Sequence, residues 1–207
     1  MSDTDQSGRM ILRSSTTSPF GRKTRMAVLI HGLQDRVTLV PADTLDPNDS
    51  LRSQNPLGKI PCLILADVGV LFDSRVIVEY FDSISDQPPL LPRSGRARFE
   101  VLTRAVLADG ITDAALLMVY EGRFREPQQH SERWLEHQRG KVRRGLAAIG
   151  NSPPPIAQPD LSSLALACAL AYLDWRKPMP WREDHPGLVQ WLDSFSDQVP
   201  SFALTAA

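Results

Sequence analysis

Short apolar runs alternate with periodic apolar stripes in the N-terminal part of the chain. The runs predict strands at residues 10–12 and 37–40, and a hairpin formed by residues 61–65 and 68–72. Stripes at helical spacing predict helices that begin at Pro19 and at Asp73–Ser74 and end near residues 32 and 84. Residues 43–55 are too rich in Asp, Asn, Pro and Ser for more than a short turn of helix. The predicted order is therefore strand, helix, strand, hairpin, helix.

The pattern changes to helical periodicity after a proline-rich connector at residues 87–92. Helices are predicted at these segments: 96–124, 128–149, 161–175 and 186–197. Residues 161–173 are apolar on all sides, which is typical of a central buried helix. The sequence thus predicts an α+β domain over residues 10–86 and an all-helical domain over residues 95–207. The first nine residues are polar and acidic, and we expect a loose tail there.

Composition and charge narrow the class of protein. The 207 residues include 42% hydrophobic residues, enough for a core, and 23 basic against 24 acidic side chains give a net charge of -1. This balance argues against a nucleic-acid partner. The longest apolar stretch, residues 164–173, is about half the length of a membrane span, so no membrane partner is expected. The start of the sequence lacks the apolar core of a signal peptide, and the chain has two cysteines, Cys62 and Cys168. Both features favour free thiols and a cytoplasmic location.

Histidines and carboxylates provide no clear metal or acid–base site. The four histidines are scattered without the spacing of metal ligands, so no metal is expected. Asp109 and Asp113 are four residues apart on a predicted helix, where paired carboxylates can do acid–base work. Two solvated acids, or caps near Gly110, are the favoured interpretation. Cys168 lies within the apolar helix and is expected in the core.

Residues 55–61 place a turn directly before a strand that begins with Pro61. If the bond before Pro61 is cis, the backbone of Ile60 faces outward and forms a short docking edge for an extended peptide-like ligand. The alternative is an ordinary loop that enters a strand. These residues alone favour the ordinary loop.

Two helix starts have both a structural and a functional interpretation. Asp73 and Ser74 can simply cap a helix, or they can hold the ammonium and the carboxylate of an α-amino acid. A hydroxyl among residues 14–18 can cap the first helix, or it can stabilise a thiolate carried by a ligand. The basic residues that follow, Arg22, Lys23 and Arg25, are interpreted as a solvated helix face.

Taken together, in this order and spacing, the motifs resemble the cytosolic glutathione S-transferase family, in particular its small bacterial serine-type members. The resemblance extends from Leu12 to about Phe202. Its most specific parts are residues 17–23 (TSPFGRK), 55–61 (NPLGKIP), 72–80 (FDSRVIVEY), 108–114 (ADGITDA) and 165–173 (ALACALAYL). The family implies a thioredoxin-like N-terminal domain with a mixed four-stranded sheet, and an all-α C-terminal domain.

The resemblance also implies a homodimer that binds glutathione as cosubstrate and transfers it to a small hydrophobic electrophile. The implied glutathione-binding residues are Ser18, Phe20, Lys59, Ile60, Pro61, Asp73, Ser74 and Asp113. In some classes an aspartate at the position of Asp113 reaches glutathione bound to the partner subunit.

Individual roles follow from position in the family motifs. Ser18 would be catalytic, because its hydroxyl would donate to the glutathione sulfur and lower the pKa of the thiol. The backbone of Ile60 would pair with the cysteinyl unit, and Lys59 would meet the glycyl carboxylate. Asp73 and Ser74 would hold the γ-glutamyl end.

The sequence departs from the family pattern in ways that leave alternatives open. Cysteine-type members have Cys where this chain has Ser18, so mixed-disulfide reductase chemistry is disfavoured. Four neighbours of Ser18 are alternative sulfur donors: Ser14, Ser15, Thr16 and Thr17. The buried helix starts with Asp160 and Ser163 in place of the usual Ser or Thr and Asp, so half of a reciprocal cap is altered. A catalytically silent protein-binding or stress-regulatory module is the alternative function.

Overall fold

The computed structural model describes residues 9–66 and 69–206, so the first eight of the nine residues expected to form a loose tail lie outside the described part. The described residues form two compact units. The first contains the residues up to Leu91 together with those from Ser201 onward, and the second contains Pro92–Pro200. The prediction assigned all of residues 95–207 to the helical domain, and the structure corrects its C-terminal end.

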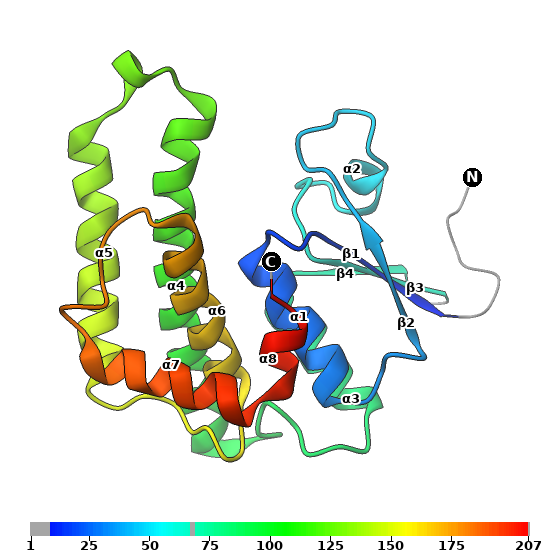
Figure 1. The fold of residues 1–207 in the computed structure, drawn as a ribbon. Helices are drawn as coiled ribbons and strands as arrows, with labels where there is room; N and C mark the ends of the chain where they lie inside the picture. The colour runs from blue at the N-terminus through cyan, green and yellow to red at the C-terminus, as the bar shows by residue number, and fades with distance from the viewer. Residues whose placement is uncertain (1–8, 67–68, 207) are drawn as a thin grey trace. The chain divides into compact units, whose positions relative to one another are not determined.

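A mixed four-stranded sheet forms the centre of the first unit (Figure 1). Its strands are β1 (Met10–Ser14), β2 (Val37–Pro41), β3 (Cys62–Leu65) and β4 (Gly69–Phe72), in the order β2-β1-β3-β4. β1 pairs with β2 in parallel, and the other pairs are antiparallel. Every residue of β1 is buried because this strand lies inside the sheet. The predicted strands and the sheet of the thioredoxin-like domain are confirmed.

Helices cover both faces of this sheet. In Figure 1, α1 (Pro19–Ile30) and α3 (Ser74–Ile84) lie together below the sheet, and the short α2 (Leu51–Gln54) lies above it. The apolar stripes predicted from the sequence are the buried sides of these helices. Met26 of α1 and both Ile77 and Phe81 of α3 are fully buried. Burying side chains of this size contributes about 1.5–3 kcal/mol each.

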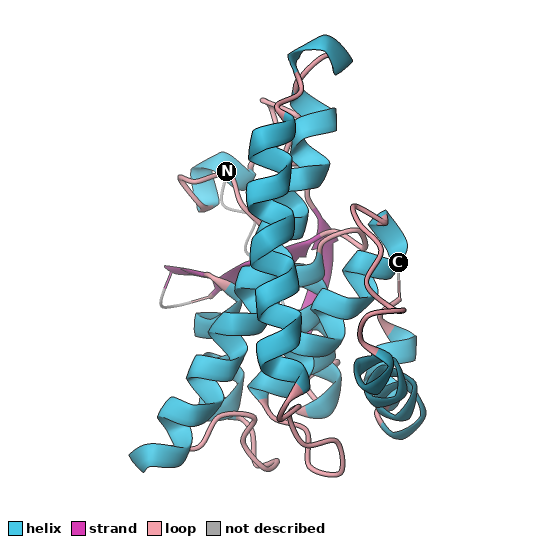
Figure 2. Ribbon diagram, turned by 90° about the vertical axis from the view of Figure 1, so that its left-hand side faces the viewer, coloured by secondary structure: helices cyan, strands magenta, loops and turns pink. Residues whose placement is uncertain are grey.

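The second unit is entirely helical among its described elements. It contains α4 (Gly95–Phe124), the short 3-10 turn η1 (Pro127–Gln129), α5 (Glu132–Gly150), α6 (Leu161–Arg176) and α7 (Pro186–Gln198). The long helices α4 and α5 run side by side (Figures 1 and 2). Most of α6 is buried, as its apolar sequence predicts. Among the described residues, none of the helices has both the length and the apolar character that a bilayer requires.

The reciprocal cap of α6 is complete, which corrects the expectation of a half-altered cap. The Ser163 N–H donates to Oδ1 of Asp160 at 2.9 Å, and the Asp160 N–H donates to Oγ of Ser163 at 3.2 Å. Aspartate and serine have exchanged positions but provide the same two acceptors. The exchange therefore retains both bonds of the capping box.

The prediction is also wrong at the start of α5 and at the C-terminal end. The expected helix from residue 128 is divided, because η1 ends before α5 begins at Glu132 with Ser131 as its cap. A short C-terminal helix, α8 (Pro200–Leu204), was not predicted. Arg22 of α1 donates to the carbonyl oxygen of Phe202 at 2.7 Å, which ties this end of the chain to the first unit.

Candidate functional site

Ser18 caps the helix that follows β1. Its backbone is extended, and its Oγ accepts a hydrogen bond from the N–H of Gly21 at 3.0 Å, while Pro19 occupies the first helical position. This is the arrangement that the sequence predicts for a helix start. The hydroxyl is an acceptor toward the helix, so its proton is available to donate outward. The positive end of the helix dipole favours an anion at the same place.

The neighbouring hydroxyls lie in different environments. Ser14 is buried in β1, and a Cβ atom built on Gly21 would lie only 2.3 Å from its Oγ. This close packing requires glycine at position 21 and encloses the Ser14 hydroxyl beneath the helix start. The hydroxyls of Ser15 and Thr17 bond to each other at 2.8 Å in an exposed loop. The Ser18 hydroxyl thus lies at the boundary between the enclosed and the exposed hydroxyls.

The turn before β3 is held by Asn55. Its side-chain N–H donates to the carbonyl oxygen of Lys59 at 2.8 Å, and its Oδ1 accepts the N–H of Leu57 at 3.1 Å. Asn55 itself is buried, whereas the side chain of Lys59 is exposed. The bond between Ile60 and Pro61 is cis. These features fix the backbone just before the strand.

Asp73 caps α3 in an unusual backbone conformation, with φ of 72°. Such conformations cost about 1–3 kcal/mol for a residue other than glycine and cluster at functional sites. Its carboxylate accepts two hydrogen bonds from the Arg75 guanidinium, at 3.0 and 2.8 Å, and one from the Arg75 N–H. Ser74 is buried beside it. The Arg75 guanidinium holds the pKa of the Asp73 carboxyl below its usual value, although burial opposes this effect.

Lys23 is buried, which corrects the interpretation of residues 22–25 as a solvated face. It is only 1% exposed, and its Nζ lies 5.6 Å from the centre of the Phe20 ring. Its positive charge also contributes to lowering the pKa of Asp73. Lys23 precedes Met26 and Ala27 by three and four residues, so its position on the apolar stripe of α1 was visible in the sequence.

The strand register brings three loops to one end of the sheet. Arg13 at the end of β1 pairs with Cys62 at the start of β3, and Cys62 pairs with Phe72 at the end of β4. The Ser18 loop follows β1, the segment 59–61 precedes β3, and Asp73 follows β4. All three therefore leave the sheet at the same end, where together they can contact one extended ligand. Strand pairing is what brings these distant motifs together.

The remaining expected site residue belongs to the second unit. Asp113 is an exposed residue of α4. Asp109, one turn earlier, is buried, although a solvated side chain was expected. The two carboxylates that the sequence analysis considered as a pair therefore lie in different environments of the same helix. Within residues 9–66 and 69–206, no group of three or more His, Cys, Asp and Glu side chains is arranged to hold a metal ion.

Both cysteines are buried free thiols, as predicted. Burial raises the pKa of the Cys62 thiol to about 11, although the charge of Arg13 opposes the rise. Cys62 is therefore almost entirely in the thiol form at neutral pH. We expect neither Cys62 nor Cys168 to react with an aromatic disulfide reagent in the native protein, and both to react in urea. Rapid labelling of one thiol per native chain would contradict this prediction.

Comparison with known proteins agrees with this geometry. The family described as "Glutathione S-transferase, N-terminal domain" matches residues 17–84. The GST-like protein YibF of Escherichia coli (strain K12), described as uncharacterized, is 35% identical over 202 residues, which cover 95% of this chain and 98% of YibF.

Two solved structures extend the comparison to the whole fold. A glutathione transferase family member from Pseudomonas fluorescens Pf-5, with bound glutathione, is 42% identical with a TM-score of 0.88. A glutathione S-transferase from Methylobacillus flagellatus KT, also with glutathione bound, is 35% identical with a TM-score of 0.86. Each alignment covers 95% of this chain and 98% of the other. With its thioredoxin-like unit, its helical unit and these relatives, the chain belongs to the glutathione S-transferase family.

Proposed function

We propose that this protein is a glutathione S-transferase that presents glutathione as a thiolate to a small hydrophobic electrophile. The observation that carries the proposal is the register that aligns Arg13, Cys62 and Phe72 across the sheet. It gives one extended tripeptide access to all three loops at the same end of the sheet. The relatives with glutathione bound support the same ligand.

Glutathione would lie across these loops with its parts matched by chemistry. The Ser18 hydroxyl donates to the sulfur beside Phe20, and the backbone of Ile60, before Pro61, pairs with the cysteinyl unit. Lys59 is exposed and cationic, which suits the glycyl carboxylate. At the other end, the γ-glutamyl ammonium pairs with the Asp73 carboxylate, and the start of α3 with Ser74 receives the carboxylate.

The reaction needs no metal and no redox partner. The thiol proton leaves to solvent, and the sulfur lone pair forms a bond to the electrophilic carbon. The electrons of the broken bond depart with the leaving group or move to the neighbouring atom of an activated double bond. The protein lowers the barrier by stabilising the thiolate, through the hydrogen bond from Ser18 and the dipole of α1.

We further propose that the protein is a homodimer. Each unit carries large exposed apolar side chains, namely Phe72 and Val76 in the first and Phe99 and Val106 in the second. Phe99 and Val106 are seven residues apart and thus lie on one face of α4. Burying such side chains against a second copy removes apolar surface from water. The family resemblance assigns Asp113 to contact with the glutathione bound to the partner subunit of such a dimer.

Isothermal titration with glutathione, followed by a conjugation assay with an aromatic halide, tests the proposal. We expect saturable binding of one glutathione per chain and turnover that requires the thiol. Binding without conjugation of any of a panel of electrophiles would support the silent module instead. Failure of the protein to bind glutathione would reject the proposed site.

Replacing Asp73 by asparagine should weaken glutathione binding about fivefold, equivalent to about 1 kcal/mol. Asparagine tolerates the positive φ and retains a capping oxygen, but it lacks the charge that pairs with the γ-glutamyl ammonium. Asp86→Asn removes an exposed carboxylate from the same unit and serves as the matched control. Equal dissociation constants for the two variants in calorimetry would contradict the role of Asp73.

A further inference from the structure

A buried arginine of the central strand holds the loop that precedes the proposed docking edge. Arg13 is only 6% exposed, although it lies in β1 among apolar neighbours. Its guanidinium donates four hydrogen bonds, all to the segment from Pro41, the last residue of β2, to Gln54, the last residue of α2. The acceptors are the carbonyl of Pro41 (3.1 Å), Oδ1 of Asp49 (2.7 Å), Oγ of Ser50 (2.8 Å) and Oε1 of Gln54 (2.9 Å).

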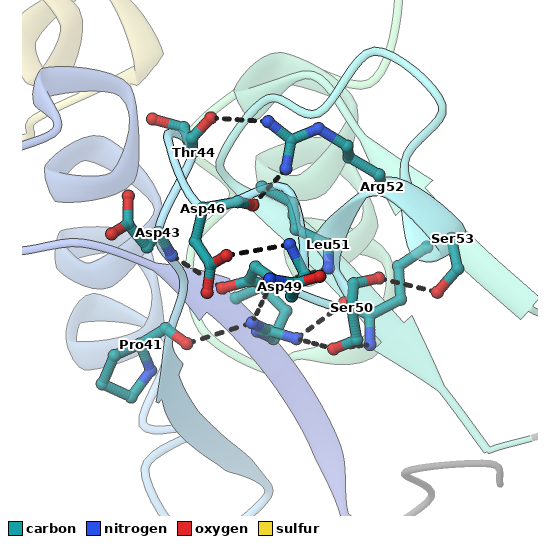
Figure 3. Close-up of polar contacts among 12 residues, drawn as sticks. Pro41, Asp43, Thr44, Asp46, Asp49, Ser50, Leu51, Arg52 and Ser53 are labelled. Carbon is teal, nitrogen blue, oxygen red and sulfur yellow. Dashed lines mark hydrogen bonds and ion pairs between the residues drawn. The ribbon is translucent and has the colours of Figure 1, made fainter.

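Asp49 is the counter-charge, and the loop folds around it (Figure 3). Its side chain is 12% exposed and accepts the N–H groups of Asp43 and Leu51, each at 2.7 Å. Burial alone would raise the pKa of the Asp49 carboxyl, but the two backbone N–H donors and the charge of Arg13 outweigh it and lower the pKa. The carboxylate therefore stays charged at neutral pH and holds both ends of the loop.

The held loop continues directly into the docking edge. Leu51 of α2 is fully buried, and its carbonyl accepts the N–H of Asn55 at 2.7 Å. Asn55 in turn binds the carbonyl of Lys59, the residue before Ile60. Arg13 also pairs in the sheet with Cys62, two residues after Ile60. Arg13 is thus connected to the docking edge on both sides: through α2 and Asn55 before it, and through Cys62 after it.

We propose that Arg13, through its ion pair with Asp49, is a positioning residue that keeps α2 and residues 55–61 in the conformation that receives the cysteinyl-glycyl half of glutathione. This inference rests on the proposed function. Arg13 does not touch the ligand. It keeps the loop ordered before glutathione binds. The apparent affinity for glutathione decreases when fewer molecules have the binding-competent conformation, so an ordered loop strengthens binding.

The test compares two variants at the start of α2 that loosen this anchor with a variant within α2 that leaves it intact. Asp49→Asn removes the counter-charge, and Ser50→Ala removes one acceptor of Arg13. Ser53→Ala is the matched control, since Oγ of Ser53 donates to the carbonyl of Ser50 and makes no bond to Arg13. Arg52 lies exposed within α2. Cleavage by trypsin after Arg52 therefore reports the opening of this helix without reference to activity.

We expect Asp49→Asn to weaken glutathione binding about fivefold and Ser50→Ala about twofold, with turnover at saturating glutathione within twofold of the parent. Without ligand, both variants should be cleaved faster after Arg52, and saturating glutathione should restore the slow cleavage. Ser53→Ala should match the parent in all three measurements. If Asp49→Asn does not fold, Gln54→Ala, which removes another acceptor of Arg13, takes its place.

The outcomes separate this inference from the proposed function. If the parent protein binds no glutathione, the proposed function fails, and this inference fails with it. If the parent binds and the anchor variants bind equally well, only the positioning role is overturned. A loss of turnover at saturating glutathione with an unchanged dissociation constant would also overturn it, because an ordering role affects binding and leaves the chemical step unchanged.

Discussion

Replacing Ser18 by alanine is expected to raise the thiol pKa of bound glutathione by about two units, which corresponds to about 2.7 kcal/mol of lost thiolate stabilisation. Below pH 6 the thiolate population should fall about 100-fold. The more basic thiolate is a better nucleophile, which offsets part of this loss. The net expectation is a fall in turnover of at least about tenfold at low pH, a gap that closes above about pH 9.

Neighbouring hydroxyls provide the matched controls for this experiment. Ser15→Ala and Thr17→Val remove hydroxyls of the same loop, and we expect both variants to retain the parent pH profile. Ser18→Thr retains a hydroxyl and a cap, so it should restore most of the activity at low pH. If Ser15→Ala or Thr17→Val loses turnover at low pH while Ser18→Ala keeps the parent pH profile, the catalytic role belongs to Ser15 or Thr17 and not to Ser18.

Replacing Asp82 by alanine is expected to destabilise the first unit by about 3–5 kcal/mol. The carboxylate of Asp82 accepts the N–H groups of Leu90 and Leu91 at 2.8 and 2.9 Å, where the chain leaves the sheet unit. It also lies 2.8 Å from Nε2 of the buried His31, without the alignment of a hydrogen bond. Alanine would leave these two buried backbone N–H donors without their acceptor.

Urea unfolding followed by circular dichroism measures this effect. Asp86→Ala removes an exposed carboxylate four residues later and should change the free energy of unfolding by less than about 0.5 kcal/mol. Asp82→Asn retains one acceptor oxygen and should fall between the two alanine variants. The account of Asp82 is wrong if Asp82→Ala unfolds within about 1 kcal/mol of Asp86→Ala.

Much of the fold follows from local sequence patterns. The alternation of apolar runs and stripes predicted every strand and both long helices of the first unit, because burial on one face imposes its period on the sequence. The same holds for Ser18 and Asp73, which are recognisable because helix starts need a capping oxygen. Their assignment to glutathione came from the resemblance, since a cap and a binding site have the same local sequence.

The rest depends on contacts between residues distant in sequence. Arg13 forms an ion pair with a residue 36 positions later, and no local period indicates this partner. A single charged residue in an apolar strand was the available signal. The first unit also includes the residues from Ser201 onward, where Arg22 donates to the carbonyl oxygen of Phe202. Such pairings become visible only when strand order and register are known.

The central claim is that the protein binds glutathione as a thiolate at neutral pH. Titrating the purified protein with glutathione at pH 7, while recording the ultraviolet difference absorbance of the thiolate, tests it most directly. The account predicts a thiolate signal that saturates at one glutathione per chain and is lost in Ser18→Ala. Saturable binding without a thiolate signal, or no binding at all, would contradict it.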